Sequence, residues 1–387
     1  MTGKNSSSIH IGVGIDGAGR HPGAWRVPGA DPKHLFTAEH TLELARLAER
    51  GMLDYVSLDD SFRLETDRDD HLRGRLDALL TMARVAPQTT SIGLVPTVTT
   101  THTEPFHVSK NLATLDFVSL GRAGWLVDVS TTEAEAFHFG RRTVAEPADL
   151  YAEAAEAIDV VSQLWDSWED DAVIRDVATG RYIDRDKLHV TNFEGRYFSV
   201  RGPSITPRSP QAQSIVVVDA IHDLSLAVGI EHADVILVHP ASISEAKALR
   251  ERVERGLADA ARAPKDVAVL AVIDVQLADT ASAAAAARRR LDEWAGALPA
   301  APLEHIGTAG ALADLIGEWA DAGVVDGFHV RPATLPDTLR RFVDDVVPLL
   351  QAHGLFRTEY AGRTLRDHFG LDRPANRYAT TTPEGSR

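Results

Sequence analysis

Short apolar runs alternate with longer amphipathic segments along most of this chain, and this alternation limits its possible folds more than any other feature. Each short run has the composition of a buried strand, and each longer segment carries apolar residues at helical spacing. Strands that alternate with helices pair in parallel and are joined by right-handed crossovers. The expected strands are Ile9–Asp16, Asp54–Asp60, Ser91–Thr99, Ala123–Val129, Ile215–Ala220, Ala233–Val238, Val267–Leu277 and Val325–Val330.

Eight strand–helix units favour closure of the sheet, and we predict an α/β fold of the (β/α)8 TIM-barrel type with insertion segments. An open doubly wound sheet is the competing architecture. Its dinucleotide-binding form needs a glycine-rich turn that leads from the first strand into a helix. Ile15–Gly19 lacks the third glycine of that turn, so the sequence favours the barrel. The expected helices are Leu35–Arg50, Leu76–Ala86, Pro105–Leu120, Pro147–Trp165, a helix ending at Gly229, Ser244–Ala261, Ala281–Trp294, Ala309–Ala322 and Asp337–His353.

One stretch breaks the alternation. Residues Asp166–Gln213 are polar, punctuated by Gly and Pro and dotted with aromatic residues, so we expect an insertion there. The residues after the last expected helix, 354–387, form a C-terminal tail. Although a length of 387 residues suggests two or three domains, we predict a single barrel domain over residues 1–387 that carries this insertion and this tail.

The composition excludes several kinds of protein. Because the chain has no cysteine, it has no disulfide, no zinc–thiolate site and no thiol nucleophile. Its 40 Lys and Arg against 56 Asp and Glu give a net charge of −16, which argues against nucleic acid or an anionic membrane as a partner. No apolar stretch is long enough to span a membrane, and Met1–Ser8 lacks the apolar core of a signal peptide. We therefore expect a cytoplasmic enzyme.

The polar residues that end the expected strands are the first candidates for a site. The sixteen histidines show no HExxH pattern and the chain has no GxSxG turn, so we expect neither a metal site nor a serine hydrolase. In an α/β barrel the active site lies at the C-terminal ends of the strands. The residues at those ends are His21, Trp25, Asp59, Asp60, Thr99 to His102, Asp128, Ser130, His222, His239 and His329.

Several motifs in the chain resemble one family of enzymes. The stretches are HPGAWRVP (His21–Pro28), TTTHTEPFHVSK (Thr99–Lys110), LGRAGW (Leu120–Trp125), LWDSWEDDA (Leu164–Ala172), HVTNFEGRYFSVRGP with PRSPQ (His189–Gln211), VDGFHV (Val325–Val330) and YAGRTLRDHFGL (Tyr360–Leu371). In this order they resemble the bacterial-luciferase-like flavin monooxygenases. They are most similar to the branch that oxidises nitrilotriacetate and dibenzothiophene sulfone.

The resemblance implies a barrel that binds reduced FMN at the C-terminal ends of its strands. It also implies that a separate flavin reductase supplies the reduced FMN and that O₂ is used to oxygenate a small organic substrate. The chemistry then belongs to the flavin, and the protein orients it and excludes water. The insertion 166–213 would act as the lid of the active site. The family further suggests a homodimer or a higher homo-oligomer.

The resemblance also assigns functions to individual residues. Asp59 or Asp60 matches an acidic residue beside the isoalloxazine ring, and Thr99, Thr100 and Thr101 match hydroxyl groups beside that ring. Ser130 follows the fourth strand, although the asparagine that the family places near it is absent. Tyr151 matches a tyrosine that reaches the flavin phosphate. His21 matches the histidine of the substrate pocket, and His305 is a second candidate for that pocket, so both are candidate catalytic residues.

The phosphate-binding loop departs most from the family pattern AGxSxxG. The first glycine is replaced by Ala220, the serine by His222 and the second glycine by Ser225. Asp219 and Asp223 add two negative charges beside the expected phosphate. Repulsion from one such charge amounts to about 3–4 kcal/mol at an effective dielectric constant near 20, unless His222 or another cation offsets it.

These departures leave an alternative open. The chain would then be a paralogue with an eroded FMN phosphate site that serves as a non-catalytic subunit or binds a different ligand. A deazaflavin-dependent dehydrogenase on the same fold is a third option that the motifs of the branch disfavour. Binding of FMN separates the first hypothesis from the second.

Overall fold

The structure, a computed structural model, describes residues 8–379, in which eight parallel strands close into a barrel. Around the barrel the order is β1, β2, β3, β4, β9, β10, β11 and β13, and β13 pairs with β1. The predicted TIM barrel and each of its eight expected strands are therefore confirmed. The strands are β1 (His10–Gly14), β2 (Tyr55–Leu58), β3 (Gly93–Thr99), β4 (Gly124–Asp128), β9 (Ile215–Asp219), β10 (Val235–Val238), β11 (Ala268–Leu277) and β13 (Gly327–Pro332).

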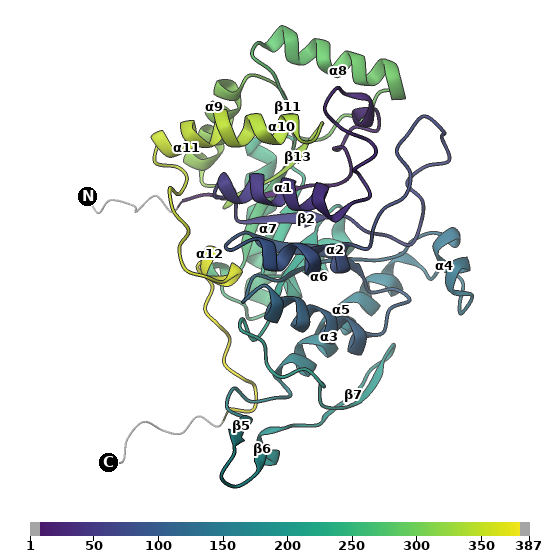
Figure 1. Ribbon diagram of the computed structural model, residues 1–387, viewed down its shortest axis with the longest axis vertical. Helices are drawn as coiled ribbons and strands as arrows, with labels where there is room; N and C mark the ends of the chain where they lie inside the picture. The colour runs from purple at the N-terminus through teal and green to yellow at the C-terminus, as the bar shows by residue number, and fades with distance from the viewer. Residues whose placement is uncertain (1–7, 380–387) are drawn as a thin grey trace.

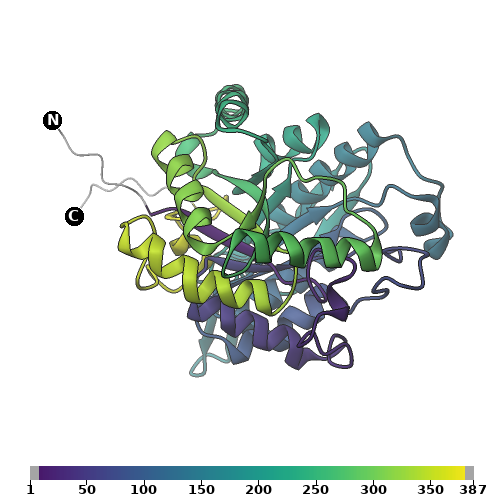
Figure 2. The ribbon, with the colours of Figure 1, turned by 90° about the horizontal axis from the view of Figure 1, so that it is seen from above.

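Helices cover the outside of the barrel (Figures 1 and 2). All the expected helices are present, with ends shifted by a few residues, and the last expected one is divided by a π-helical turn at Phe342–Val346. The helices are α1 (Ala38–Arg50), α2 (Ala78–Val85), α3 (Pro105–Val118), α4 (Glu133–Phe139), α5 (Pro147–Asp166), α6 (Asp223–His232), α7 (Ile243–Asp259), α8 (Ala281–Ala295), α9 (Ala309–Ala322), α10 (Asp337–Arg341), α11 (Val347–Ala352) and α12 (Leu365–His368).

Two elements inside the barrel sequence were not predicted. Strand β12 (Glu304–Gly307) pairs with the last residues of the long strand β11, beyond the point where β10 ends. It has four residues and no apolar alternation, so periodicity gives no signal for it. Helix α4 had a signal, because Thr132 and Glu135 form a capping box of the T-x-x-E type.

A cluster of apolar side chains fills the barrel interior toward the N-terminal ends of the strands, which we call the base. This cluster includes Tyr55, whose ring needs Gly12 on the neighbouring strand, because a Cβ there would lie 2.1 Å from the ring. Helix α12 closes the base from below. Its Leu365 lies against Gly93 and Gly124, the first residues of β3 and β4, and its neighbour Phe369 joins the same cluster.

Three aspartates secure the base by one repeated arrangement. Asp54, Asp234 and Asp326 each precede a strand directly and accept a hydrogen bond from a backbone N–H of the adjacent strand. Each also pairs with an arginine from elsewhere in the chain. The arginine partners are Arg357, Arg366 and Arg250, in the same order. These contacts fix the register of neighbouring strands at the base.

The insertion 166–213 folds into two antiparallel hairpins at the lower end of Figure 1. They are β5 (Val173–Asp176) with β6 (Arg181–Ile183), and β7 (Thr191–Glu194) with β8 (Ser199–Gly202). The turn after β7 packs on the outside of α5, where Glu156 accepts three backbone N–H groups of residues 196–198. The insertion is thus an outer layer on α5.

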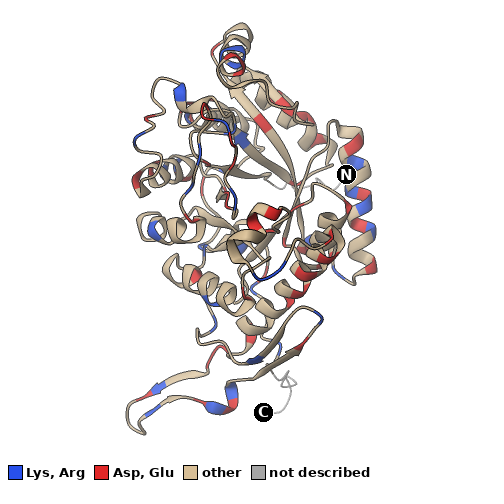
Figure 3. Cartoon of the chain, turned by 90° about the vertical axis from the view of Figure 1, so that its right-hand side faces the viewer, with Lys and Arg blue, Asp and Glu red and all other residues tan. Residues whose placement is uncertain are grey.

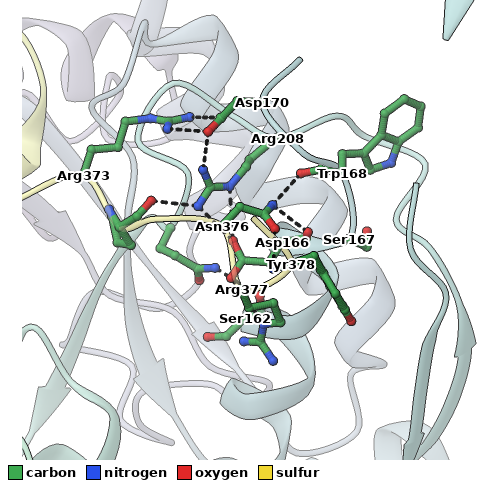
Figure 4. Close-up of polar contacts among 12 residues, drawn as sticks. Ser162, Asp166, Ser167, Trp168, Asp170, Arg208, Arg373, Asn376, Arg377 and Tyr378 are labelled. Carbon is green, nitrogen blue, oxygen red and sulfur yellow. Dashed lines mark hydrogen bonds and ion pairs between the residues drawn. The ribbon is translucent and has the colours of Figure 1, made fainter. Parts of the chain in front are cut away.

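The C-terminal tail is clamped to the root of this insertion (Figure 4). The buried guanidinium of Arg208 pairs with Asp166 at 3.0 Å and with Asp170 at 2.8 Å, and it donates to the carbonyl of Pro374. Asn376 donates to the carbonyl groups of residues 166 and 168, both at 2.8 Å. Residues 380–387 of the tail and Met1–Ser7 lie outside the described residues. In the described part, no helix has the length and apolar character needed to cross a membrane.

Candidate active site

We call the C-terminal ends of the strands the mouth. A cavity of about 500 Å³ lies there beside the ends of β1, β2 and β13. The cavity lies between the loop after β1, the start of α1 and the loop after β2, with Leu298 and Arg331 from later in the chain. These loops project on the right of Figure 1, and Figure 3 looks onto that side, where acidic and basic segments surround the strands. None of the residues 166–213 lines this cavity, so a lid function for the insertion stays a prediction.

Two carboxylates lie at the wall of the cavity formed by β1 and β2. The backbone N–H of Asp59 donates to Oδ1 of Asp16 at 2.5 Å, and Arg75 lies 3.5 Å from Asp59 and 2.7 Å from Glu65. Burial and the neighbouring charge of Asp59 raise the pKa of Asp16 to about 7. Asp60 instead accepts the N–H groups of Ser61 and Ala78 and so caps the start of α2. Of the two predicted aspartates, only Asp59 therefore lines the cavity.

A histidine and a tyrosine extend the polar surface into the barrel. The Tyr55 hydroxyl lies 3.0 Å from Nδ1 of His329, and both side chains are buried. Burial, with a smaller effect from Arg331, lowers the pKa of His329 to about 3, so the ring is neutral. In a neutral ring one nitrogen carries the proton and the other accepts, so His329 offers one donor and one acceptor inside the barrel. A Cβ at Gly14 would be in ordinary van der Waals contact with Nε2 of His329, at 3.7 Å.

The predicted hydroxyl groups meet at the ends of β3 and β4. The Thr100 hydroxyl donates to the carbonyl of Asp128 at 3.1 Å, and the neighbouring Thr99 is buried in register with Asp128. Ser130 is buried too, and its Oγ has no hydrogen-bond partner among the described residues. Burial, with Asp59 as a negative neighbour, raises the pKa of Asp128 to about 7. An unpartnered buried hydroxyl at a strand end fits a ligand with polar atoms.

The phosphate loop forms a compact self-capped turn. Nδ1 of His222 accepts the N–H of Ser225 at 3.2 Å, and Oγ of Ser225 accepts the N–H of His222 at 3.2 Å. The ring of Tyr151 meets the His222 ring edge-on, with the ring centroids 4.7 Å apart. Ala220 precedes this turn. The structure thus brings together the predicted Tyr151, His222 and Ser225.

The two aspartates of this loop have partners. Asp223 pairs with Arg252 at 2.7 Å, and Asp219 pairs with Nε2 of His239 at 2.5 Å. The sequence alone suggested two uncompensated charges beside a phosphate. Arg252, on the neighbouring α7, supplies an offsetting charge for Asp223, and His239, directly after β10, forms a hydrogen bond with Asp219.

The two predicted catalytic histidines lie apart from these residues. Nδ1 of His21 accepts the N–H of Gly23, and its Nε2 donates to Asp292 on α8 at 3.0 Å. His305 lies on β12, outside the closed ring of strands, with Nε2 3.0 Å from the carbonyl of Thr308. Neither histidine lines the large cavity.

Sequence reasoning missed several charged residues that do line the cavity. Asp16 ends the first expected strand and Arg331 directly follows the last one, so their strand-end position was a usable signal. Arg20 and Arg75 come from loops and had none. Among the described residues, no group of three or more His, Asp or Glu is arranged to hold a metal ion.

Comparison with known proteins agrees with this geometry. The family model for luciferase-like monooxygenases matches residues 17–328. N-acetyl-S-(2-succino)cysteine monooxygenase of Bacillus subtilis (strain 168) is 33% identical over 98% of this chain and 100% of its own length. Nitrilotriacetate monooxygenase component A of Aminobacter aminovorans is 32% identical over 97% of this chain and 99% of its own.

The fold has close relatives among solved structures. EDTA monooxygenase from Chelativorans sp. BNC1 superposes with a TM-score of 0.86 at 22% identity, over 95% of this chain and 99% of its own. The match of sequence extends through both the barrel and the insertion. The chain therefore belongs to the bacterial luciferase-like monooxygenase family.

Proposed function

We propose that this protein is a flavin-dependent monooxygenase that uses reduced FMN and O₂ to oxygenate a small organic substrate. A separate flavin reductase supplies the reduced FMN, and the enzyme works as a homodimer or a higher homo-oligomer. The observation that carries the proposal is the unpartnered buried Oγ of Ser130, whose backbone N–H donates to the Thr101 hydroxyl, at the mouth of a barrel related over its whole length to named monooxygenases.

The residues present fit FMN in two parts. Ser130, Thr99 and Thr100 offer hydroxyl groups for the polar edge of the isoalloxazine ring. Tyr151 and the backbone N–H groups at the N-terminus of α6 would hold the phosphate once the His222 ring that caps the N–H of Ser225 has moved aside, with the dipole of the ten-residue helix favouring the anion. The ion pair of Asp223 with Arg252 lowers the repulsion that the sequence suggested.

Reduced FMN, when bound, supplies the electrons that activate O₂. The residues of the chain position the flavin and limit its contact with water. The side chain of Asp59 opens into the cavity beside this region, and the loop that follows β2 borders the cavity and limits access of water. Asp16 holds the backbone of Asp59 in place and shares the wall of the cavity with it.

Anaerobic titration with reduced FMN tests the proposal. The wild-type protein should bind it with micromolar affinity, and Ser130→Ala should weaken binding about fivefold, because one hydrogen bond is worth about 1 kcal/mol. Ser244→Ala, an exposed serine on α7, is the matched control and should change nothing. If neither reduced nor oxidised FMN binds the wild-type protein, the proposal is wrong. A non-catalytic subunit or a protein for another ligand would then be the better explanation, and the self-capping of His222 favours that second candidate.

A further inference from the structure

Four polar side chains share the inner wall of the barrel where β3 and β4 end. They are Thr97, Thr99, Asp128 and Ser130. Val95 and Leu126, which come two residues before the first polar residue of each strand, pack in or against the apolar cluster inside the barrel. Because side chains of a strand alternate between its two faces, the polar residues continue these inner rows. Thr99 and Asp128 are direct neighbours across the two strands.

Three of these side chains have no partner within the part of the chain that the structure describes. Oγ1 of Thr97 and Oγ of Ser130 are buried and accept or donate no hydrogen bond there. Asp128 forms no ion pair there, and its side chain is only partly buried at the mouth. Buried polar groups are hydrogen-bonded as a rule. A carboxyl that shares a wall with two unpartnered hydroxyl groups therefore indicates a wall that a polar ligand completes.

The groups that face Asp128 do not compensate its charge. Burial is the main reason that the pKa of Asp128 rises to about 7, and the charges of Asp59 after β2 and Glu135 on α4 raise it further. The N–H of the next residue and the charge of Arg63, in the loop after β2, do not offset this rise. From α5, Tyr151 faces the same carboxyl, whose charge adds to the effect of burial in raising the pKa of that tyrosine to about 12. The neutral and the ionised form of Asp128 are therefore both populated near pH 7.

We propose that Asp128 is a binding residue for the isoalloxazine ring and that flavin binds tightly only while this carboxyl carries a proton. A neutral carboxyl offers one O–H donor and one acceptor, which matches the alternating N–H and C=O groups along the polar edge of the ring. An ionised carboxylate only accepts, and a flat ring that covers it removes its water without supplying a cation. This inference rests on the proposed function, since it names the residue that makes flavin binding depend on pH.

Fluorescence titration with oxidised FMN and with riboflavin at pH 6 and pH 8 tests the inference. The oxidised ring does not titrate in this range and riboflavin has no phosphate, so neither group accounts for a change that both ligands show. With a pKa of about 7, the neutral fraction of Asp128 falls about tenfold between these pH values, so both dissociation constants should rise about tenfold. Equal affinities at the two pH values overturn the inference.

Proton uptake gives a second measurement on the wild-type protein. Isothermal titration with riboflavin in two buffers of different ionisation enthalpy should show uptake of about one proton per flavin at pH 8, because Asp128 must be neutral in the complex. At pH 6 the carboxyl already carries its proton, so almost no uptake is expected. The absence of uptake at pH 8 also overturns the inference.

Variants assign the pH dependence to this one carboxyl. Asp128→Asn keeps a donor and an acceptor but cannot ionise, so its affinity for both flavins should be the same at pH 6 and pH 8 and close to that of the wild type at pH 6. Asp69→Asn, at a fully exposed aspartate, is the matched control and should retain the wild-type pH dependence. Circular dichroism checks that both variants fold. A pH dependence that survives in Asp128→Asn counts against the assignment and overturns it.

The same titrations separate this inference from the proposed function. If reduced FMN binds while the oxidised flavins fail to bind, or bind equally well at both pH values, the inference about Asp128 is wrong and the proposed function stands. If no flavin binds in either redox form, the proposed function is wrong and the inference falls with it.

Discussion

The mouth and the base of this barrel use the same residue type, aspartate, in opposite ways. At the base, Arg357, His10 and the N–H of Ile11 overcome the effect of burial and lower the pKa of Asp54 to about 2. At the mouth, burial and a negative neighbour raise the pKa of Asp16 and of Asp128 to about 7. Asp54, Asp234 and Asp326 at the base are paired with arginines and stabilise the fold, whereas Asp16 and Asp128 at the mouth form no ion pair among the described residues.

The difference indicates where the chain gives up stability for function. An ionised carboxylate without a cation in a desolvated wall opposes folding, so its presence needs another reason. In a (β/α)8 barrel, residues at the C-terminal ends of the strands carry chemistry and those at the N-terminal ends carry stability. Asp54 at the base and Asp16 and Asp128 at the mouth follow that division.

The largest expected effect comes from breaking the base. Asp54→Ala should lower the free energy of unfolding by about 3–5 kcal/mol, because Arg357 would be left buried without its partner. Urea unfolding followed by circular dichroism measures this. Asp69→Ala, at a fully exposed aspartate, should change the value by less than about 0.5 kcal/mol. Equal effects of the two variants would refute the view that the base depends on buried pairs.

A slightly smaller effect is expected at the clamp of the C-terminal tail. Arg208→Met removes the contacts to Asp166, Asp170 and the carbonyl of Pro374, but Arg377 still pairs with Asp166. The loss in unfolding free energy should be about 2–3 kcal/mol. Limited proteolysis should cut the tail of the variant faster than that of the wild type. Arg201→Met, on the exposed side of β8, is the control, and a tail equally protected in both variants would count against the clamp.

At the mouth, replacing a carboxylate is expected to raise the free energy of unfolding instead of lowering it. The folded-state pKa of Asp16 is about 7 and its unfolded value is near 3.8, so the folded state binds the proton more tightly and loses stability as the pH rises from about 4 to 7. Asp16→Asn removes this loss and should raise the unfolding free energy by about 1–2 kcal/mol at pH 8. Urea unfolding from pH 4 to 9 measures the difference. Asp54→Asn should instead destabilise across the range above pH 4, and a pH-independent effect of Asp16→Asn would contradict the assignment.

The smallest expected effect concerns the N-terminus of α6, where we propose that the flavin phosphate binds. His222→Ser keeps a capping hydroxyl but removes the imidazole that occupies the N-terminus of α6. Affinity for FMN should rise about tenfold, while affinity for riboflavin, which lacks the phosphate, should stay the same. Fluorescence titration with both flavins measures the ratio. A fall in FMN affinity would show that His222 itself serves as the cation for the phosphate.

The sequence was sufficient to predict the barrel architecture and the candidate residues that lie at strand ends. Apolar periodicity placed all eight barrel strands, because a buried parallel strand needs a continuous apolar run. It gave no sign of β12 or of the hairpins in the insertion, because these strands are short and polar. Hydrogen bonds from the turn after β7 to Glu156 on α5 stabilise one of the hairpins. Strand-end position predicted that Asp59, Thr99, Thr100 and Ser130 lie at the C-terminal end of the barrel, since closure brings such ends together; their function stays a prediction.

The charged partners could not be found in the same way. The guanidinium that compensates Asp223 comes from α7, and the one that faces Asp274 comes from β13. Asp60 is adjacent to Asp59 but caps α2, because successive side chains at the end of a strand point to opposite sides. Local sequence carries no information on which of two neighbours faces the cavity.

By itself, the sequence determined the parallel barrel, the order of its strands and the presence of polar residues at the C-terminal ends of those strands. These follow from local patterns, namely apolar runs, helical spacing and polar residues at strand ends. Only the tertiary structure decided which charges are compensated and which are available. That depends on register and closure, which bring Arg20 from the beginning of the chain to Asp274 and Arg331 near its end.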